Sequence, residues 1–267
     1  MAKPFRVFFV CALAASLYLL VMPLPAAARD AVLAELFARR NTDGTLVLSS
    51  LKSGRTFVHN DERSNRRFAV ASTFKILNSL IALEEKVATG KDHVIRWNGR
   101  RHEFSDWNRD QTLESAFRVS CVWYYQELAR LIGAQKYRDC LKRSGYGKLR
   151  EPFDTTTFWL DGSLEISASE QTDFLRNVYL RKLPFSDFSY TTLREIMVAE
   201  SNPDFSIYGK TGWAASAKPQ TGWYVGYLET HDEVWFFALN MDIRSETDLP
   251  LRKQLVREAL VAKGIIR

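Results

Sequence analysis

The sequence SIYGKTGWA at residues 206–214 is followed by TGWYVGYLE at 221–229 and VWFFALNM at 234–241. Each stretch alternates in strand fashion, is rich in aromatic or β-branched residues, and is separated from the next by a turn-like segment. Together they predict an antiparallel meander of three strands near the carboxyl end. Two more strands are predicted near the amino end, at Gly44–Leu51 and Arg55–Asn60.

The long segment between these two groups of strands is predicted to be helical. Helical periodicity or helix caps occur in six stretches, at residues 72–86, 111–120, 122–133, 135–144, 169–181 and 190–199. Helices are also expected at both ends of the mature chain, over Asp30–Arg40 and Leu249–Lys263.

This order of elements predicts an α+β fold. Both chain ends build one antiparallel sheet flanked by the terminal helices, and the middle of the chain forms an inserted all-helical lobe. We expect residues 29–65 and 204–267 to form the sheet lobe and residues 66–203 the helical lobe. Because no repeat or linker interrupts residues 29–267, we expect a single catalytic unit whose functional groups meet at the seam between the lobes.

Residues 1–28 have the layout of a secretory signal peptide. Lys3 and Arg6 give a positive start, residues 7–21 are nearly all apolar, and Ala26-Ala27-Ala28 offers a cleavage site. We therefore expect a mature chain from Arg29, exported to the periplasm and not held at the membrane. A retained membrane anchor is the alternative, which the prolines and alanines that end this segment disfavour.

Charge and composition disfavour several functions. The net charge of +6 includes two cations in residues 1–28, which carry no acids, and the remaining +4 is scattered along the chain, so nucleic acid is not an expected partner. The histidines show no metal-ligand spacing, so no metal site is expected. A Ser-His-Asp hydrolase is disfavoured because the Gly-x-Ser-x-Gly motif is absent.

Two cysteines remain after the expected cleavage, Cys121 and Cys140. The export compartment permits a disulfide between them. We favour two buried free thiols on adjacent helices, because a chain of this length does not need a disulfide for stability.

The segment Ser72-Thr73-Phe74-Lys75 places a hydroxyl and an amine one helical turn apart at the start of an apolar helix. Burial can lower the pKa of a lysine enough for its amine to act as a base. The free N–H groups of a first helical turn can also receive an oxyanion formed at the serine. The segment therefore predicts an acyl-transfer site, although Ser49-Ser50-Leu51-Lys52 shows that the same spacing also occurs at a strand end.

Three further motifs could complete such a site. Ser120-Cys121-Val122 lies between two predicted helices, where a short loop could point a second hydroxyl at Ser72. Lys210-Thr211-Gly212-Trp213 lies on a predicted strand and offers a cation and a hydroxyl to an anion, with Gly212 allowing close approach; a plain strand with an exposed lysine is the alternative. Trp159 is either a core residue or an indole N–H donor to a buried anion.

These motifs occur in the order used by the serine β-lactamase and penicillin-binding protein superfamily, and the chain resembles its class D β-lactamases. The resemblance covers essentially the whole mature chain, and the matching motifs are STFK at 72–75, SCV at 120–122, YGK at 146–148, WLDGSL at 159–164 and KTG at 210–212. The family's Tyr-Gly-Asn is altered to end in Lys148, so the asparagine's role cannot be assigned here. Ser-Asp-Asn and the loop glutamate motif of class A are absent.

The resemblance implies a β-lactamase that hydrolyses penicillin-type antibiotics through an acyl-enzyme on Ser72 and so confers antibiotic resistance. It implies that Lys75 is N-carboxylated by carbon dioxide and serves as the general base of both steps, without a metal or a separate cofactor. Trp159 is implied to hold the carbamate by a hydrogen bond. Val122 and Val70 are implied to keep its surroundings apolar.

The resemblance also assigns roles in proton transfer and substrate binding. Ser120 is implied to relay a proton to the leaving lactam nitrogen, and the backbone N–H groups of Ser72 and Trp213 to form the oxyanion hole. Three residues are implied to hold the substrate carboxylate: Lys210, Thr211 and Arg252. A solvated helix arginine is the alternative for Arg252.

Two other functions share this framework, a β-lactam-binding sensor and a penicillin-binding transpeptidase. A sensor is usually joined to membrane-spanning segments, and a transpeptidase to an anchor or an extra domain. Because neither feature is visible in the sequence, we expect a hydrolase. The β-lactam subclasses accepted and the oligomeric state do not follow from the sequence.

Overall fold

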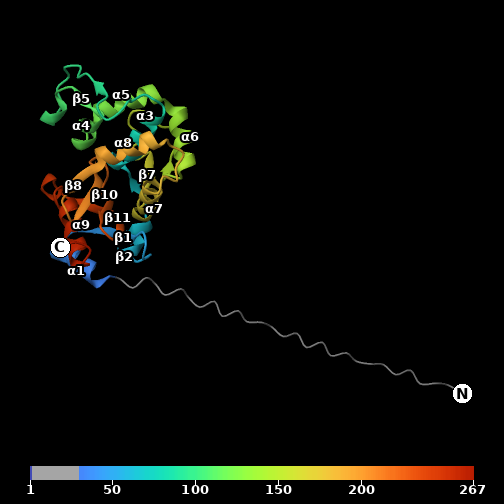
Figure 1. Cartoon of the computed structure of the whole chain (residues 1–267), viewed down its shortest axis with the longest axis vertical. Helices are drawn as coiled ribbons and strands as arrows, with labels where there is room; N and C mark the ends of the chain where they lie inside the picture. Colours follow the sequence, from blue (N-terminus) through green and yellow to red (C-terminus); the bar gives the residue numbers. More distant parts are fainter. Residues whose placement is uncertain (2–29) are drawn as a thin grey trace.

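The computed structural model describes Met1 and residues 30–267, so the expected signal peptide lies, apart from Met1, outside the described residues. Figure 1 shows the strands of both chain ends together, with the helices of the middle segment beside them. The main sheet has six strands in the order β2-β1-β11-β10-β9-β8. Their bounds are β1 Gly44–Ser50, β2 Thr56–His59, β8 Val198–Ser201, β9 Phe205–Ala214, β10 Gln220–Thr230 and β11 Val234–Ile243.

The central strands are buried on both faces. Along β10, Trp223, Val225 and Tyr227 point into a core shared with the helical lobe, whereas Tyr224 and Leu228 point into a second core. This alternation follows from the two-residue period of a strand. The meander expected over residues 206–241 is thus present, with nearly unbroken burial because helices cover both of its faces.

The terminal helices α1 (Ala31–Arg39) and α9 (Leu251–Ala262) pack over the second core, and they lie together near the carboxyl terminus in Figure 1. Asp30 caps α1, since its Oδ1 accepts a hydrogen bond from the Leu33 N–H over 3.1 Å. Lys263 Nζ contacts the other oxygen of Asp30 at 2.7 Å and joins the two helices. The predicted α+β fold, with a sheet from both chain ends flanked by terminal helices, is confirmed.

The middle segment contains two small sheets as well as helices, which differs from the all-helical lobe that we expected. Strands of two or three residues are too short to give a recognisable alternation in sequence. The small sheets comprise β3 Phe68–Ala69, β7 Leu164–Ile166 and β6 Lys148–Leu149, and separately β4 Val94–Ile95 and β5 Gln111–Thr112. The helices are α2 Asp61–Asn65, η1 Ala71–Phe74, α3 Lys75–Glu84, η2 Ser105–Trp107, α4 Leu113–Arg118, α5 Val122–Ile132, α6 Ala134–Ser144, α7 Ala168–Tyr179 and α8 Asp187–Met197, with η3 Glu246–Asp248 before α9.

The edge of the main sheet formed by β8 differs from our expectation, and it leaves part of β9 without a neighbouring strand. The helix expected over 190–199 begins earlier, where Ser186 caps α8, and it ends at Met197. Residues 198–201, which we assigned to the helical lobe, form β8 and pair with β9 only as far as Tyr208. The rest of β9, from Gly209 to Ala214, therefore has no strand neighbour on this side among the described residues.

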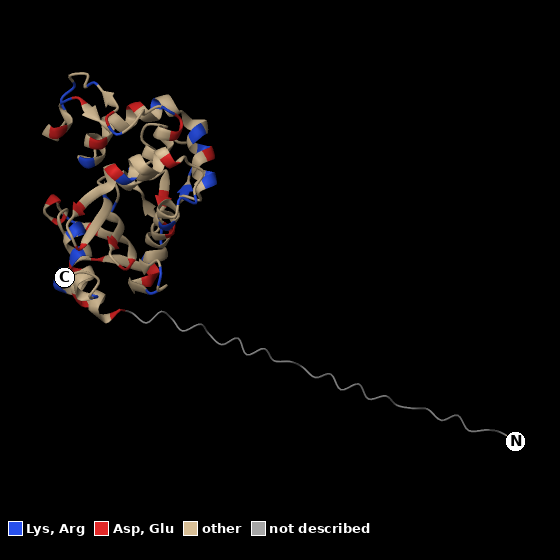
Figure 2. Ribbon diagram, in the orientation of Figure 1, with Lys and Arg blue, Asp and Glu red and all other residues tan. Residues whose placement is uncertain are grey.

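Charged residues of both signs are interspersed over both lobes (Figure 2). Within residues 30–267, none of the helices combines the length and the apolar character needed to cross a bilayer.

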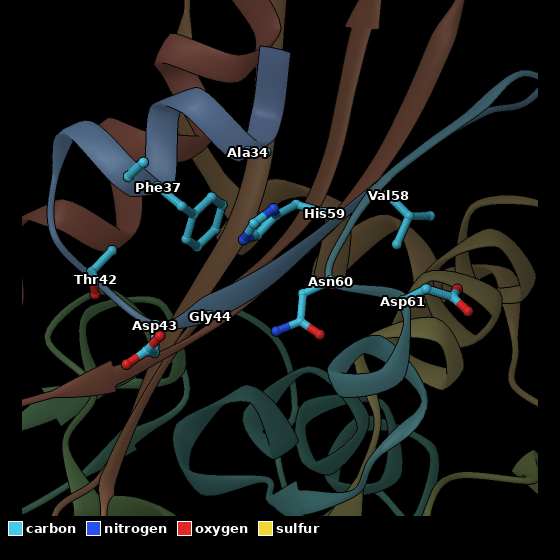
Figure 3. Close-up of a pocket in the computed structure, with 10 residues that line it drawn as sticks. Ala34, Phe37, Thr42, Asp43, Gly44, Val58, His59, Asn60 and Asp61 are labelled. Atoms are coloured by element: carbon cyan, nitrogen blue, oxygen red, sulfur yellow. The ribbon is translucent and has the colours of Figure 1, made fainter. Parts of the chain in front are cut away.

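A cavity of about 480 Å³ lies between α1, the start of β1 and the end of β2 (Figure 3). There the Phe37 ring stacks on His59, with ring centroids 4.1 Å apart. None of the residues that line this cavity belongs to the predicted acyl-transfer site.

Candidate active site

Ser72 and Lys75 lie where the short 3₁₀ turn η1 runs into α3, so the helix expected from Ser72 begins with 3₁₀ geometry. Lys75 Nζ donates a hydrogen bond to Ser72 Oγ over 2.8 Å. Ser72 is 7% exposed and Lys75 is 0% exposed. The amine therefore contacts the hydroxyl inside the protein and does not point into solvent.

The turn that carries Ser72 is held by several contacts. Ala71 has φ of 46°, in the left-handed region that non-glycine residues rarely occupy. The Thr73 hydroxyl and N–H both donate to the Val70 carbonyl, over 2.6 and 3.2 Å, and Gln171 Nε2 donates to the Thr73 hydroxyl over 2.9 Å. These bonds fix the position of Ser72 between Thr73 and the strained Ala71.

Burial dominates the electrostatics of Lys75. Loss of solvent lowers the pKa of its amine to about 7, opposed by a smaller upward effect of the neighbouring Cys121 thiol. The Tyr125 ring lies 5.1 Å from Nζ and supplies a π-face, but within residues 30–267 Lys75 has no carboxylate partner. Neutral and protonated amine therefore coexist near pH 7.

Ser120 and Lys210 form a second contact of the site. Ser120 occupies the short turn between α4 and α5 with φ of 59°, again in the left-handed region. Lys210 extends from β9, and its Nζ donates to Ser120 Oγ over 2.8 Å and to the Thr211 carbonyl over 2.9 Å. The contact joins two residues that are 90 positions apart in sequence.

Lys210 is buried, not exposed as in the alternative that we considered for this strand. Burial holds the pKa of its amine well below its ordinary value, and the cations Lys75, Arg252 and Lys253 lower it further. The charged forms of these groups are therefore costly, and within residues 30–267 none of the four has a carboxylate partner, so an anionic ligand would stabilise the protonated site.

Gly212 brings β9 against the turn that carries Ser72. A side-chain Cβ at this position would lie 3.1 Å from Thr73 Cγ2 and 3.3 Å from the Thr73 nitrogen. Arg252 donates to the Gly212 carbonyl over 2.7 Å, and burial lowers the pKa of its guanidinium to about 10. Trp213 points its indole N–H away to Gln220, at 2.9 Å, and so contributes its backbone at this position.

Trp159 is a fully buried side chain that stacks on Phe74, the residue before Lys75, with ring centroids 6.0 Å apart. Its indole N–H is buried and has no hydrogen-bond partner in the described part of the chain. Such an unpaired donor is costly unless a ligand or modification accepts its hydrogen bond. Val70 is fully buried beside this region, and Val122 at the start of α5 is half-buried.

The penicillin binding protein transpeptidase domain matches residues 39–261. β-Lactamase OXA-48 of Klebsiella pneumoniae is 40% identical over 230 residues, covering 86% of this chain and 87% of that protein. β-Lactamase OXA-10 of Pseudomonas aeruginosa is 36% identical over 233 residues, covering 86% and 88%. The chain belongs to the class D β-lactamases.

Solved structures of class D β-lactamases share the fold. The crystal structure of FUS-1 (OXA-85) from Fusobacterium nucleatum subsp. polymorphum superposes with a TM-score of 0.87 at 35% identity, covering 90% of this chain and 100% of that one. As a class D β-lactamase the chain is a hydrolase of the β-lactam ring, which confirms the predicted family and enzyme class. Enzymes of this class need no metal cofactor.

Sequence reasoning missed two aromatic residues that enclose the site of this β-lactamase. Tyr125 covers the Lys75 amine and is itself fixed by a 2.8 Å hydrogen bond to Ser79. Trp107 donates its indole N–H to the Val119 carbonyl over 3.0 Å, next to Ser120. Tyr125 could have been found because it lies three residues after Val122, on the same face of a predicted helix.

Cys121, which we expected to be a buried free thiol, also neighbours the amine of Lys75. Cys121 and Cys140 are both buried free thiols. Burial raises the pKa of the Cys121 thiol to about 11, so it stays protonated near neutral pH. It therefore lines the lysine pocket as a small uncharged group.

Proposed function

We propose that this chain is an exported enzyme that hydrolyses penicillin-type antibiotics through an acyl-enzyme on Ser72. The observation that carries the proposal is the 2.8 Å contact between the Lys75 amine and the Ser72 hydroxyl in a buried pocket. A serine needs a base to become a nucleophile, and a desolvated lysine is the group in contact with it.

In the proposed first step, Ser72 Oγ passes its proton to Lys75, the base in contact with it, and attacks the lactam carbonyl carbon. The carbonyl oxygen becomes an oxyanion, for which the backbone N–H groups of Ser72 and Trp213 are the proposed donors. The close packing of Gly212 on Thr73 supports this assignment, since it brings the two backbone segments together. The C–N bond of the ring then breaks, leaving an ester on Ser72.

Ser120 is the proposed carrier of the proton that the lactam nitrogen takes up as it leaves. Its hydroxyl already accepts a hydrogen bond from Lys210, which leaves the hydroxyl proton free to point at the substrate. Water then gives up a proton and attacks the ester carbon, the bond from that carbon to Ser72 Oγ breaks, and Ser72 Oγ takes up a proton as the ring-opened acid leaves.

The substrate carboxylate is proposed to bind Lys210, Thr211 and Arg252. Burial and, secondly, the neighbouring cations lower the pKa of Lys210, and this supports the assignment because a bound carboxylate stabilises the protonated amine. Arg252 is held in place through its contact with the Gly212 carbonyl.

Lys75 is proposed to be N-carboxylated by carbon dioxide. Two observations support carboxylation of Lys75. The pKa of its amine is about 7, so a fraction of the amine is neutral and can react with carbon dioxide. The buried N–H of Trp159 has no partner among the described residues and can donate a hydrogen bond to the new carboxylate. Val70 and Val122 keep water from the pocket. When present, the carboxyl group supplies the general base for acylation and deacylation.

Turnover of a chromogenic penicillin by the protein from Arg29 onward tests the hydrolytic function. We expect many substrate molecules to be consumed for each enzyme molecule. A single stoichiometric burst without turnover contradicts the hydrolase proposal and favours the β-lactam-binding sensor.

A pair of tryptophan variants tests the carboxylation. Trp159→Phe removes the unpaired N–H, so we expect slower deacylation and a stronger dependence on added bicarbonate. Trp223→Phe is the matched control, because Trp223 is equally buried but its N–H is satisfied by the Ala69 carbonyl at 2.9 Å. An unchanged bicarbonate dependence in Trp159→Phe contradicts the proposal.

Export is proposed from the composition of residues 1–28 alone. We expect the periplasmic fraction of an expressing bacterium to contain a chain that begins at Arg29, as measured by intact mass. Recovery of the uncut chain in the membrane fraction contradicts it and supports the retained anchor.

A further inference from the structure

A cavity of about 330 Å³ lies along the edge of β9 that β8 leaves uncovered. Lys210 and Thr211 line one end of it, and Gly209 lies next to them. Successive side chains of a strand point to opposite faces, so a cavity that touches all three positions runs along the strand edge. It is thus continuous with the residues that we propose to hold the substrate carboxylate.

Part of the wall of this edge cavity is apolar, and the rest is polar or charged. The apolar part includes Phe117 of α4, Met197 at the end of α8, Val198 and the ring of Tyr224. Val198 is 50% exposed, an unusual exposure for an apolar residue beside a binding site. A planar or apolar group bound in the cavity would remove this surface from water.

Tyr224 adds an unused polar group to the cavity. Its side chain is 4% exposed and packs on Phe237, yet its hydroxyl has no hydrogen-bond partner among residues 30–267. A Cβ at Gly209 would lie 3.1 Å from this hydroxyl, which places the group at the strand edge. Because this hydroxyl reaches the cavity, it can donate a hydrogen bond to a ligand there.

The charges around the cavity are arranged unevenly. Glu195 pairs with Lys91 at 3.4 Å, and Glu114 with Arg118 at 3.9 Å. Lys253, on α9 beside Tyr224, has no carboxylate partner in the described chain, and its Nζ lies 5.9 Å from the Tyr224 ring. The end of the cavity towards α9 is therefore cationic and carries a free hydroxyl.

We propose that the edge cavity receives the substituent that a β-lactam carries on the ring carbon beside its carboxylate, and that it favours substituents ending in an anionic group. This inference rests on the proposed function. The turn of Ser72 touches β9 at Gly212, and Gly209 lies three residues back, about 10 Å along the strand. A substrate whose carbonyl is at Ser72 and whose carboxylate is at Lys210 therefore points that substituent into the cavity.

Two cephalosporins that share their acylamino side chain test the inference. One carries a methyl group beside the ring carboxylate, and the other a non-leaving substituent that ends in a second carboxylate. Second-order acylation rate constants are measured by intact mass, so the test does not depend on deacylation. Lys253→Gln and Tyr224→Phe are compared with Lys142→Gln, a control that removes one exposed, unpaired lysine on α6.

We expect the wild-type protein to prefer the dicarboxylate, and each of Lys253→Gln and Tyr224→Phe to lower that preference about three- to tenfold. Lys142→Gln should leave it unchanged. An equal effect of Lys253→Gln on both substrates, or no effect of either variant, overturns the inference. Acylation with the expected preference but without turnover supports the inference and contradicts only the hydrolase proposal.

Discussion

Lys75 illustrates a conflict between stability and chemistry within one side chain. Its burial lowers the amine pKa from 10.5 to about 7, which means that the folded state disfavours the charged form. Lys75→Met should therefore abolish turnover and raise the free energy of unfolding by about 1–4 kcal/mol near pH 7, since one pKa unit corresponds to about 1.4 kcal/mol and the hydrogen bond to Ser72 is lost. Thermal unfolding at fixed pH measures the change.

The stability difference between Lys75→Met and the wild type should depend on pH. Between pH 7 and 10.5 the unfolded state binds a proton at Lys75 that the folded state does not, so wild-type stability rises with pH in this window. The advantage of Lys75→Met should thus be largest at or below pH 7 and should shrink towards pH 10.5. A variant that is less stable than the wild type at pH 7, or an advantage that grows with pH, contradicts the account.

Ser72 and Lys75 could be found from the sequence because residues three positions apart on a helix lie on the same face. The contact between Lys210 and Ser120 could not be found from spacing, because the two residues are 90 positions apart and only the folded chain brings them together. Their proposed roles came from the resemblance to class D β-lactamases. The unpaired hydroxyl of Tyr224 gives no sequence signal at all, since any buried strand tyrosine looks alike.

The strands were predictable where alternation extends over many residues, as in β10 and β11. β8 was missed because residues 198–201 are mostly exposed and show no alternation, and the preceding helix pattern appeared to continue through them. The left-handed turns at Ala71 and Ser120 were also missed, because neither residue type favours that conformation. Tertiary packing enforces both turns.

Contacts between neighbouring elements predict different effects of an alanine substitution at Gly226 and at Gly212. At Gly226 a Cβ would lie 2.0 Å from the Tyr208 carbonyl oxygen, in the backbone of β9, so Gly226→Ala must separate two central strands. We expect a loss of about 3 kcal/mol or more in the free energy of unfolding, or failure to fold. Chemical denaturation measures the loss.

Gly212→Ala is the comparison, because its nearest contact is the Thr73 methyl group at 3.1 Å, which can move slightly. We expect it to lose about 1 kcal/mol of stability but at least about tenfold in kcat, since the new methyl displaces the turn of Ser72 from β9. Equal stability of Gly226→Ala and the wild type, or full activity of Gly212→Ala, contradicts this description of the seam.

The two lobes share one hydrophobic core, which has consequences for the whole molecule. Val225 and Phe236 of the sheet belong to the same buried cluster as Leu77 and Leu80 of α3. Neither lobe can open without exposing this cluster to water, so we expect the chain from Arg29 to unfold in a single transition, with equal calorimetric and van't Hoff enthalpies.

Arg176 tests this coupling directly, because it joins α7 to β1 across the seam. Its Nη2 donates to Ser49 Oγ over 2.8 Å and to the Ser50 carbonyl over 3.1 Å, and its guanidinium lies 4.8 Å from the Phe236 ring centroid. Arg176→Met should lower the free energy of unfolding by about 1–3 kcal/mol, which shifts Tm by about 2–4 °C per kcal/mol in a domain of this size.

The transition of Arg176→Met should remain single, because the apolar cluster still couples the lobes after one polar contact is lost. Arg138→Met is the matched control, since the exposed pair of Arg138 with Glu151 lies within the helical lobe, and we expect a change within about 0.5 kcal/mol. Calorimetry that resolves two transitions in Arg176→Met would mean that the lobes fold separately and that the seam is held by polar contacts, not by the shared core.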